Sequence, residues 1–270
     1  MNLLRQPTLF ISHGGGPCFW MDFPPPIGAH GFDALRSYLS GLLAQLKQRP
    51  QAILVISAHW EEPRVTVGTS KAPSMLFDYS GFPPHTYQLS YPAPGNPELA
   101  ARVRGLLDVA GIANAENNVR GYDHGVFVPF LIIDPETQIP VVTMSLERSL
   151  DPARHLAIGA ALAPLRDEGV LIIGSGNSFH NLHTFFDGNP APSLQFDTWL
   201  TETILLPDPS ARTTALTAWE RAPSARECHP RAEHLIPLMV AAGAGHADHG
   251  ARVFHDMIGG KAISGYAFGA

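Results

Sequence analysis

Three apolar segments of this chain have the length and composition of strands buried in the middle of a sheet. They are residues 8–12, 52–58 and 170–176, and large aliphatic residues fill most of their positions. Segments that are apolar at successive positions, and not only at every second one, are typical of parallel strands covered on both faces. The sequence therefore predicts an α/β fold built on a mainly parallel sheet.

Helix signals and further strand signals alternate with these three segments. Leucines at one-face spacing predict a helix over 32–48, and Asn96 followed by Pro97 predicts the start of a helix that ends near Gly111. Asp151 is expected to cap another helix, which ends near Gly169. We expect one catalytic domain over residues 1–270, a three-layer sandwich with a mixed, mainly parallel central sheet. The remaining predicted elements are helices over 210–218 and 230–242, strands over 64–68 and 139–146, and a hairpin of 252–258 with 262–268.

Composition excludes several classes of protein. A net charge of -6 without a basic cluster argues against a nucleic-acid partner. No uncharged apolar run is long enough to cross a membrane, and the N-terminus lacks the features of a signal peptide. The two cysteines, Cys18 and Cys228, are too few for a disulfide framework and suit a reducing compartment. We therefore expect a cytoplasmic protein.

Histidines follow the apolar segments and point to a metal or catalytic centre. His13 and His59 come directly after the first two segments, and His180 follows the third. Binding sites in open α/β sheets form outside the carboxyl ends of the strands, so we expect these side chains to meet. Neutral imidazole is a good ligand for divalent iron and for zinc.

Common catalytic motifs are absent from the sequence. There is no His-Glu-x-x-His, no Cys-x-x-Cys, no phosphate-binding Gly-Lys-Ser/Thr and no Gly-x-Ser-x-Gly. The residues alone therefore do not name a reaction for this centre. A zinc hydrolase acting on an amide or ester and a non-enzymatic metal-binding protein are two functions that such histidines would serve.

Six motifs, in this order, resemble those of one family. They are Ile-Ser-His-Gly-Gly-Gly-Pro at His13, Val-Ile-Ser-Ala-His-Trp-Glu at His59, the loop Tyr-Pro-Ala-Pro-Gly-Asn-Pro over 91–97, Tyr-Asp-His-Gly at His124, Gly-Ser-Gly-Asn-Ser-Phe-His-Asn at His180, and Ala-Glu-His-Leu at His234. From residue 7 to about 268 the chain resembles the class III extradiol ring-cleavage dioxygenases, in the single-chain branch similar to DOPA 4,5-dioxygenase. The Memo proteins resemble the same fold but act in binding, and the presence of both His124 and His180 favours catalysis.

The resemblance implies a site and a reaction. One divalent metal per chain is expected, Fe(II) for activity and Zn(II) in the isolated protein, with a small aromatic diol and O2 as the reactants. The implied metal ligands are His13, His59 and His234, and His180 is also expected to bind the zinc form. His180 and His124 are the implied acid–base groups. The reaction inserts both atoms of O2 into a catechol and opens its ring next to the diol.

Glu233 is an alternative to His234 as the third metal ligand. Non-haem iron oxygenases often use two histidines and one carboxylate, and Glu233 precedes His234. Neighbouring residues on a helix diverge by about 100°, so both cannot face one ion if this segment is helical. The branch resemblance favours His234, with Glu233 as the second choice.

Substrate contacts are predicted from an aromatic loop. Residues 70–95 are rich in proline, glycine and aromatic side chains, and loops of this length in compact domains are often functional. We expect residues 79–91 to cover the substrate, with contacts from His85, Tyr122 and Trp60. Arg120 and Lys71 are the cations nearest to the motif loops, and neither is an evident anchor for a substrate carboxylate.

Overall fold

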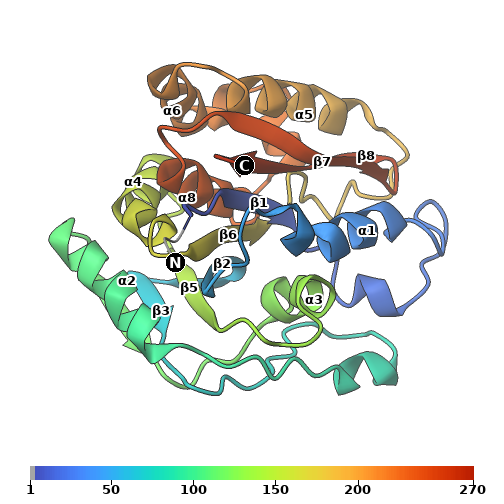
Figure 1. Cartoon of the computed structure of the whole chain (residues 1–270). Helices are drawn as coiled ribbons and strands as arrows, with labels where there is room; N and C mark the ends of the chain where they lie inside the picture. The colour runs from blue at the N-terminus through green and yellow to red at the C-terminus, as the bar shows by residue number, and fades with distance from the viewer. Residues whose placement is uncertain (1–3) are drawn as a thin grey trace.

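An eight-stranded sheet forms the centre of the computed structural model, which describes residues 4–270 (Figure 1). The spatial order of its strands is β4-β3-β5-β2-β6-β1-β8-β7. The strands are β1 (Thr8–Ser12), β2 (Ala52–Glu62), β3 (Val65–Gly68), β4 (Asn114–Asn117), β5 (Val141–Glu147), β6 (Val170–Gly176), β7 (Gly250–Ile258) and β8 (Lys261–Phe268).

The middle of the sheet is parallel, and the strand next to it on either side runs antiparallel to it. β5, β2, β6 and β1 pair in parallel, whereas β3 runs antiparallel to β5 and β8 antiparallel to β1. Residues 8–12 and 170–176 form strands as predicted, and the structure pairs them with Ser12 opposite Gly176. The predicted mixed, mainly parallel sheet is confirmed.

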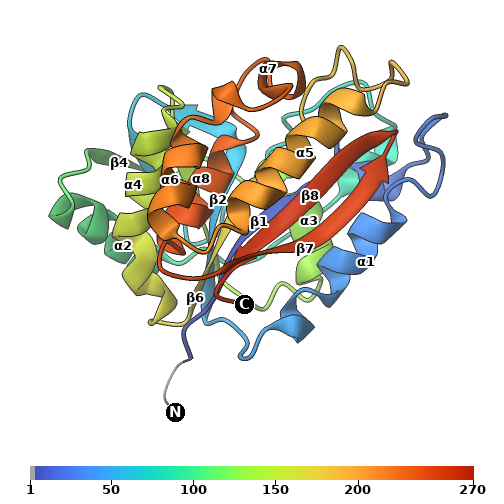
Figure 2. The same ribbon diagram turned by 90° about the horizontal axis from the view of Figure 1, so that it is seen from above.

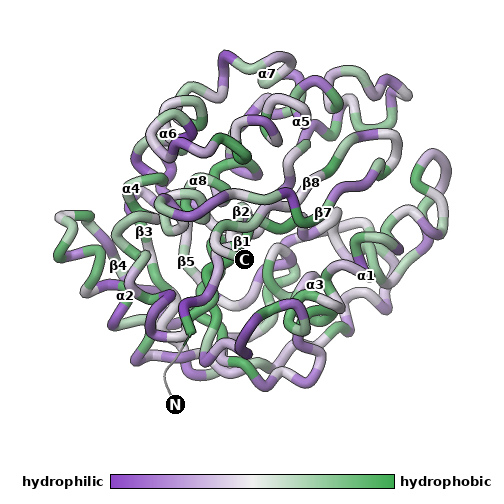
Figure 3. Tube along the Cα trace, turned by 45° about the horizontal axis from the view of Figure 1, so that its top comes forward, coloured by the Kyte–Doolittle hydropathy of each residue, from purple (hydrophilic) through white to green (hydrophobic). Residues whose placement is uncertain are grey.

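Helices cover both faces of the sheet. α1 and α3 pack on one side, and α2, α4, α5 and α8 on the other (Figure 2), which gives the predicted three layers. The helices are α1 (Asp33–Gly41), α2 (Pro97–Val109), α3 (His124–Ile133), α4 (Pro152–Leu162), α5 (Ala191–Ile204), α6 (Pro209–Thr217), α7 (Ala225–Cys228) and α8 (Ile236–Ala244). Apolar residues gather on the central strands (Figure 3).

Helix starts were predicted well where a capping side chain marks them. The Asn96 side chain accepts a hydrogen bond from the Leu99 N–H at 3.0 Å, and Asp151 accepts one from the Arg154 N–H at 2.6 Å. Each cap satisfies a backbone donor that the first helical turn leaves free. The predicted hairpin is also present, and Gly259 in its turn has a positive φ of 59°, which glycine adopts without strain.

Three boundaries differ from the prediction. The helix expected over 32–48 ends at Gly41 and continues only as a short 3-10 turn. β2 extends to Glu62, so His59 lies within this strand and not beyond its end. The pairing of β2 with β5 shifts register between Ile56 and Glu61, and such an irregularity re-aims the side chains around it.

The third difference affects the site. The helix expected over 230–242 begins only at Ile236, so Glu233 and His234 lie in the turn before α8. The angular argument for adjacent helical residues therefore does not apply to this pair.

Within residues 4–270, no helix is both long and apolar enough to cross a membrane.

Candidate metal centre

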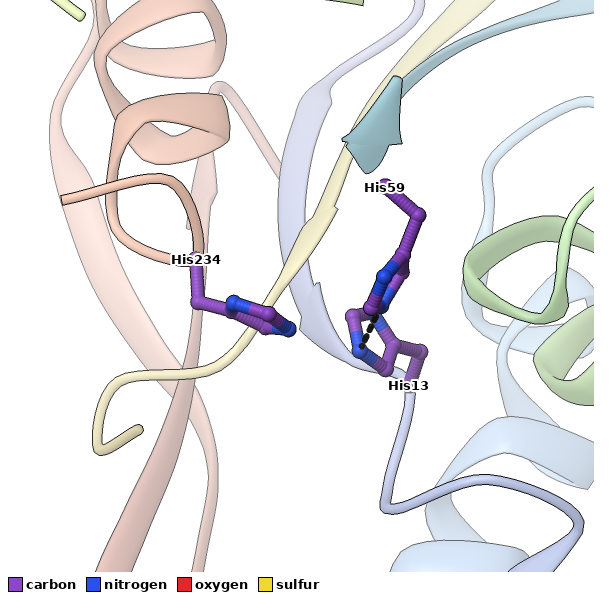
Figure 4. A group of neighbouring side chains, drawn as sticks. All are labelled: His13, His59 and His234. Carbon is purple, nitrogen blue, oxygen red and sulfur yellow. Dashed lines mark hydrogen bonds between the residues drawn. The ribbon is translucent and has the colours of Figure 1, made fainter. Parts of the chain in front are cut away.

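Three histidines meet at the carboxyl end of the central strands. His13 follows β1, His59 lies in the last part of β2, and His234 comes from the turn before α8. Figure 4 shows His13 and His59 in contact, with the ring of His234 directed toward them from the opposite side. One ring nitrogen from each residue lies within 4.8 Å of the other two. The structure thus brings together the three residues that the sequence predicts as principal metal ligands.

Backbone hydrogen bonds hold this arrangement. The His13 N–H donates to the Gly176 carbonyl at 3.2 Å, and the Asn177 N–H donates to the His234 carbonyl at 3.0 Å. A Cβ atom at Gly176 would lie 2.1 Å from the His234 carbonyl oxygen, so only glycine permits this close approach. The end of β6 therefore positions both the loop that carries His13 and the turn that carries His234.

Hydrogen bonds also decide which ring nitrogen is free on two of these histidines. The Ser175 hydroxyl donates to the Gly125 carbonyl, so His13 Nδ1, at 3.2 Å, must donate to the Ser175 oxygen. His234 Nδ1 donates to Glu233 Oε1 at 2.9 Å. Each Nε2 is left with a lone pair, an arrangement typical of histidines oriented for a metal by a second hydrogen-bond partner.

Burial keeps these imidazoles neutral near pH 7. It lowers the pKa of His13 and of His59 well below the ordinary 6.5, and the neighbouring histidines lower both further. Burial is also the main reason that the pKa of His234 falls to about 4. A neutral imidazole has the lone pair that a metal needs.

The donor set fits a divalent transition metal. The Nε2 atoms of His13 and His59 lie 3.1 Å apart, within the separation of about 3.0–3.4 Å for two nitrogens that bind one ion at about 2.1 Å in octahedral or tetrahedral geometry. Without a metal, the contact is a hydrogen bond in which one of the two nitrogens carries the proton, and a cation would take the place of that proton. Imidazole donors suit both iron and zinc.

His124 lies at the first position of α3, beside the three histidines. Its ring centroid is 3.9 Å from that of His59. Asp78 Oδ1 accepts from both His124 Nδ1, at 2.8 Å, and the His124 backbone N–H, at 3.0 Å. Burial raises the pKa of the Asp78 carboxyl, but the bonds from His124 outweigh this and bring it below its ordinary value. Sequence reasoning missed Asp78, which lies in the aromatic loop.

His180 stacks on His234, and both histidines contact the carboxylate of Glu233. The two ring centroids are 3.4 Å apart with an interplanar angle of 16°, and His180 Nδ1 lies 3.2 Å from Glu233 Oε1. Burial raises the pKa of Glu233, whereas the bonds from His180 and His234 lower it to well below its ordinary value. Glu233 thus orients two histidines and forms a second group with them, which shares His234 with the group of His13, His59 and His234.

A buried polar network supports the backbone at His59. Arg120 donates to the His59 carbonyl and to Asp123 Oδ2, each at 2.9 Å. Asp123 Oδ1 accepts from the Ser57 hydroxyl at 2.7 Å. Burial, helped by the charge of Asp78, raises the pKa of Asp123. A Cβ at Gly125 would come within 2.9 Å of the His59 ring, so glycine is needed beside His124.

The histidines open into a cavity of about 750 Å³. His13, His59, His124, His180 and His234 all line it, and its walls include Tyr79 and Phe82 of the aromatic loop. This volume falls in the range of about 300–1,000 Å³ typical of sites for small organic ligands.

The three predicted substrate contacts lie outside this lining. Tyr122 is fully buried, and its hydroxyl donates to the Val141 carbonyl at 3.0 Å. Trp60 is also buried, and its indole N–H donates to Glu62 Oε1 at 3.0 Å. His85 Nε2 lies 2.7 Å from the Trp20 carbonyl, in a separate surface hollow. Aromatic residues near a motif serve packing as readily as binding, and here Tyr122 and Trp60 have structural partners instead.

Acid is expected to destabilise the metal-free protein as the pH falls from about 6.5 to 4. Histidines of the unfolded chain have a pKa near 6.5. In the folded protein, burial lowers the pKa of His234 to about 4 and that of His229 to about 3. Between these values the unfolded state holds more protons, so stability decreases as the pH falls. Urea unfolding of metal-free protein at pH 7, 6 and 5 would measure this. A free energy of unfolding that stays constant over this range would contradict it.

The fold and this site define an α/β protein with a histidine-rich centre at the carboxyl end of its parallel strands. The sequence matches the family described as "Catalytic LigB subunit of aromatic ring-opening dioxygenase" over residues 7–268. The chain therefore belongs to the LigB family of aromatic ring-opening dioxygenases, which includes the class III extradiol enzymes.

Individual relatives agree with this assignment. The chain is 38% identical to a 4,5-DOPA dioxygenase extradiol of Beta vulgaris, over 95% of this chain and 93% of the relative. It is 35% identical to the dioxygenase tasH of Hapsidospora irregularis, over 97% and 85% respectively. The crystal structure of an uncharacterized protein, JW3007 of Escherichia coli K12, superposes with a TM-score of 0.78 at 28% identity, covering 98% of this chain and all of that one.

Proposed function

We propose that this protein is a metal-dependent extradiol dioxygenase that opens the ring of a small catechol with O2. The observation that carries the proposal is the convergence of His13, His59 and His234, with the Nε2 lone pairs of His13 and His234 left free by their Nδ1 partners. Two further histidines, His124 and His180, line the same cavity. Membership of the ring-opening dioxygenase family supports the reaction class.

His13, His59 and His234 would hold the metal, with His180 as an additional donor for zinc. Fe(II) at these residues would supply a Lewis acid for the catechol oxygens and an electron source for O2. Three neutral imidazoles bring no charge of their own. The nearby carboxylates of Asp78 and Glu233, each bonded to a histidine, provide negative charge close to a divalent cation.

His124 and His180 would move protons. Asp78 fixes the N–H of His124 on Nδ1, so Nε2 is free to accept a proton from a catechol hydroxyl. Glu233 engages Nδ1 of His180 in the same way, which leaves its Nε2 available to the substrate. A histidine can both accept and return a proton near neutral pH, as ring opening requires, first from the diol and then to the rearranging product.

Oxygen uptake by reconstituted protein would test the proposal. Metal-free protein is loaded anaerobically with Fe(II), mixed with a panel of catechols and monitored with an oxygen electrode, with zinc-loaded protein as the control. We expect uptake of one O2 per catechol and a yellow ring-opened product from the iron form alone. Hydrolysis of ester or amide substrates by the zinc form, without any oxygen uptake by the iron form, would instead indicate a zinc hydrolase.

Replacing Asp78 with asparagine is expected to lower kcat by about 10–100-fold, the usual effect of removing a carboxylate that orients a functional histidine. The amide is uncharged and holds the Nδ1 proton of His124 less firmly. Steady-state kinetics and metal analysis of the same preparation would measure this. Bound metal should stay near wild-type content, and a kcat equal to wild type would show that Asp78 does not position His124.

A further inference from the structure

The wall of the cavity beyond the histidines is mainly apolar. Phe32, Phe179, Phe185, Ile258 and Ile263 contribute to it, from four separate parts of the chain. A catechol ring needs only the end of the cavity next to the histidines. The remaining volume would accommodate a substituent, and its lining favours one without charge.

Apolar side chains also reach the mouth of the cavity. Leu182 and Phe186 line it, although 70% and 57% of their surfaces remain exposed to solvent. Phe185, from the same segment, packs its ring against that of Phe186, with centroids 5.2 Å apart. Neighbouring exposed apolar residues at the rim of a cavity are typical of a surface that a ligand covers.

The cation in the lining is already paired. Among residues 4–270, Arg231 is the one arginine or lysine that lines the cavity. Its guanidinium makes a two-pronged bond to the carboxylate of Glu61, with one N–O distance of 2.5 Å, and lies 3.5 Å from Glu233 Oε2. Such paired bonds are among the strongest that arginine makes, and although the Arg231 side chain is 54% exposed, a substrate carboxylate would have to compete with Glu61 for it.

The charge balance of the lining disfavours an anionic substituent as well. Glu61, Asp78 and Glu233 line the cavity against Arg231 alone, so its formal charge is -2 when the histidines are neutral. A divalent metal would only neutralise this charge. A carboxylate on the substrate would be partly removed from water without a free partner, which is unfavourable.

We infer that the substrate is a catechol bearing an uncharged apolar substituent, and not a catechol whose substituent carries a carboxylate. The inference rests on the dioxygenase function proposed above and narrows its substrate class. The two properties that carry it, the apolar wall with its rim and the engaged Arg231, are independent of each other. Both concern binding, so both can be tested without turnover.

A matched pair of ligands tests the inference. Propylcatechol and dihydroxyphenylpropanoate have the same length and differ in a terminal methyl or carboxylate, and DOPA serves as a third ligand. Calorimetry with zinc-loaded protein gives Kd without turnover, and oxygen uptake by the Fe(II) form gives kcat/KM. We expect propylcatechol to bind at least about tenfold more tightly than either acid, with kcat/KM in the same order. Equal or tighter binding of the acids would overturn the inference, whereas absence of oxygen uptake with every ligand would overturn the proposed reaction alone.

Two variants test the paired Arg231 and the apolar rim separately. Glu61→Gln should release Arg231 and tighten binding of dihydroxyphenylpropanoate by about tenfold, with little change for propylcatechol. Leu182→Asn should weaken propylcatechol severalfold and leave the acid nearly unchanged. Val109→Asn, at an exposed position outside the cavity lining, is the matched control and should alter neither Kd. If Glu61→Gln leaves the ratio of the two Kd values, for propylcatechol and for dihydroxyphenylpropanoate, unchanged, Arg231 does not govern that ratio and the charge argument fails.

Discussion

Replacing His59 with alanine is expected to remove the metal and to lower ring-opening kcat/KM by roughly a thousandfold or more. Loss of a residue that only orients a ligand costs about 10–100-fold, and loss of the ligand itself should exceed this. His59 Nε2 lies 3.1 Å from His13 Nε2, at the centre of the three-histidine group. Metal analysis after dialysis and oxygen uptake would measure both effects.

The matched control is His30→Ala. The His30 side chain is 89% exposed and pairs with Asp33, so its loss should leave metal content and activity at wild-type values. If the His59→Ala protein keeps one bound metal per chain and full activity, the assignment is wrong. The second group, of His180, Glu233 and His234, would then be the place to look for the ion.

Replacing His124 with glutamine is expected to lower kcat by about 10²–10⁴-fold, the usual contribution of general acid–base catalysis, while metal content stays unchanged. Glutamine keeps some of the size and polarity of histidine but cannot exchange a proton near neutral pH. His124 forms a group with His59 and Asp78, and not with His13 and His234, so an ion held by His13, His59 and His234 should remain. Turnover of a good catechol, metal analysis and the Kd for the same catechol on zinc-loaded protein would separate chemistry from binding.

The same measurements with His180→Gln are the comparison. If both histidines move protons, each single variant loses activity and retains its catechol affinity. A His124→Gln protein with wild-type kcat would show that His180 serves alone, whereas loss of metal from this variant would show that His124 supports the ion.

The sheet could be predicted because its signals are local. Residues 8–12 and 170–176 are mainly apolar at successive positions, which suits strands covered on both faces, and both segments are buried throughout. Asn96 and Asp151 mark helix starts with their own side chains. α3 was not predicted, because nine of its ten residues are buried and a helix that is apolar all round has no amphipathic period. The late start of α8 has a similar cause, since its interior gives no contrast between two faces.

Residues of the site could be predicted only where the sequence immediately around them carries a signal. His13 and His59 could be paired from their places after two apolar segments, but Asp78 reaches His124 across 46 residues from a loop without periodicity. The expected choice between Glu233 and His234 assumed a helix there. In the turn that the structure has instead, the two side chains bond to each other. Arg231 was likewise missed, because only the fold brings it to Glu61 across 170 residues.

Isotopic labelling of the product tests the central claim most directly. Fe(II)-loaded protein would turn over propylcatechol under dioxygen labelled with the heavy oxygen isotope, and the product would be reduced at once to prevent exchange of its carbonyl oxygen with water. The account predicts that mass spectrometry finds both labelled atoms in one ring-opened molecule. A product without label, or an intact ring oxidised to a quinone, would contradict it.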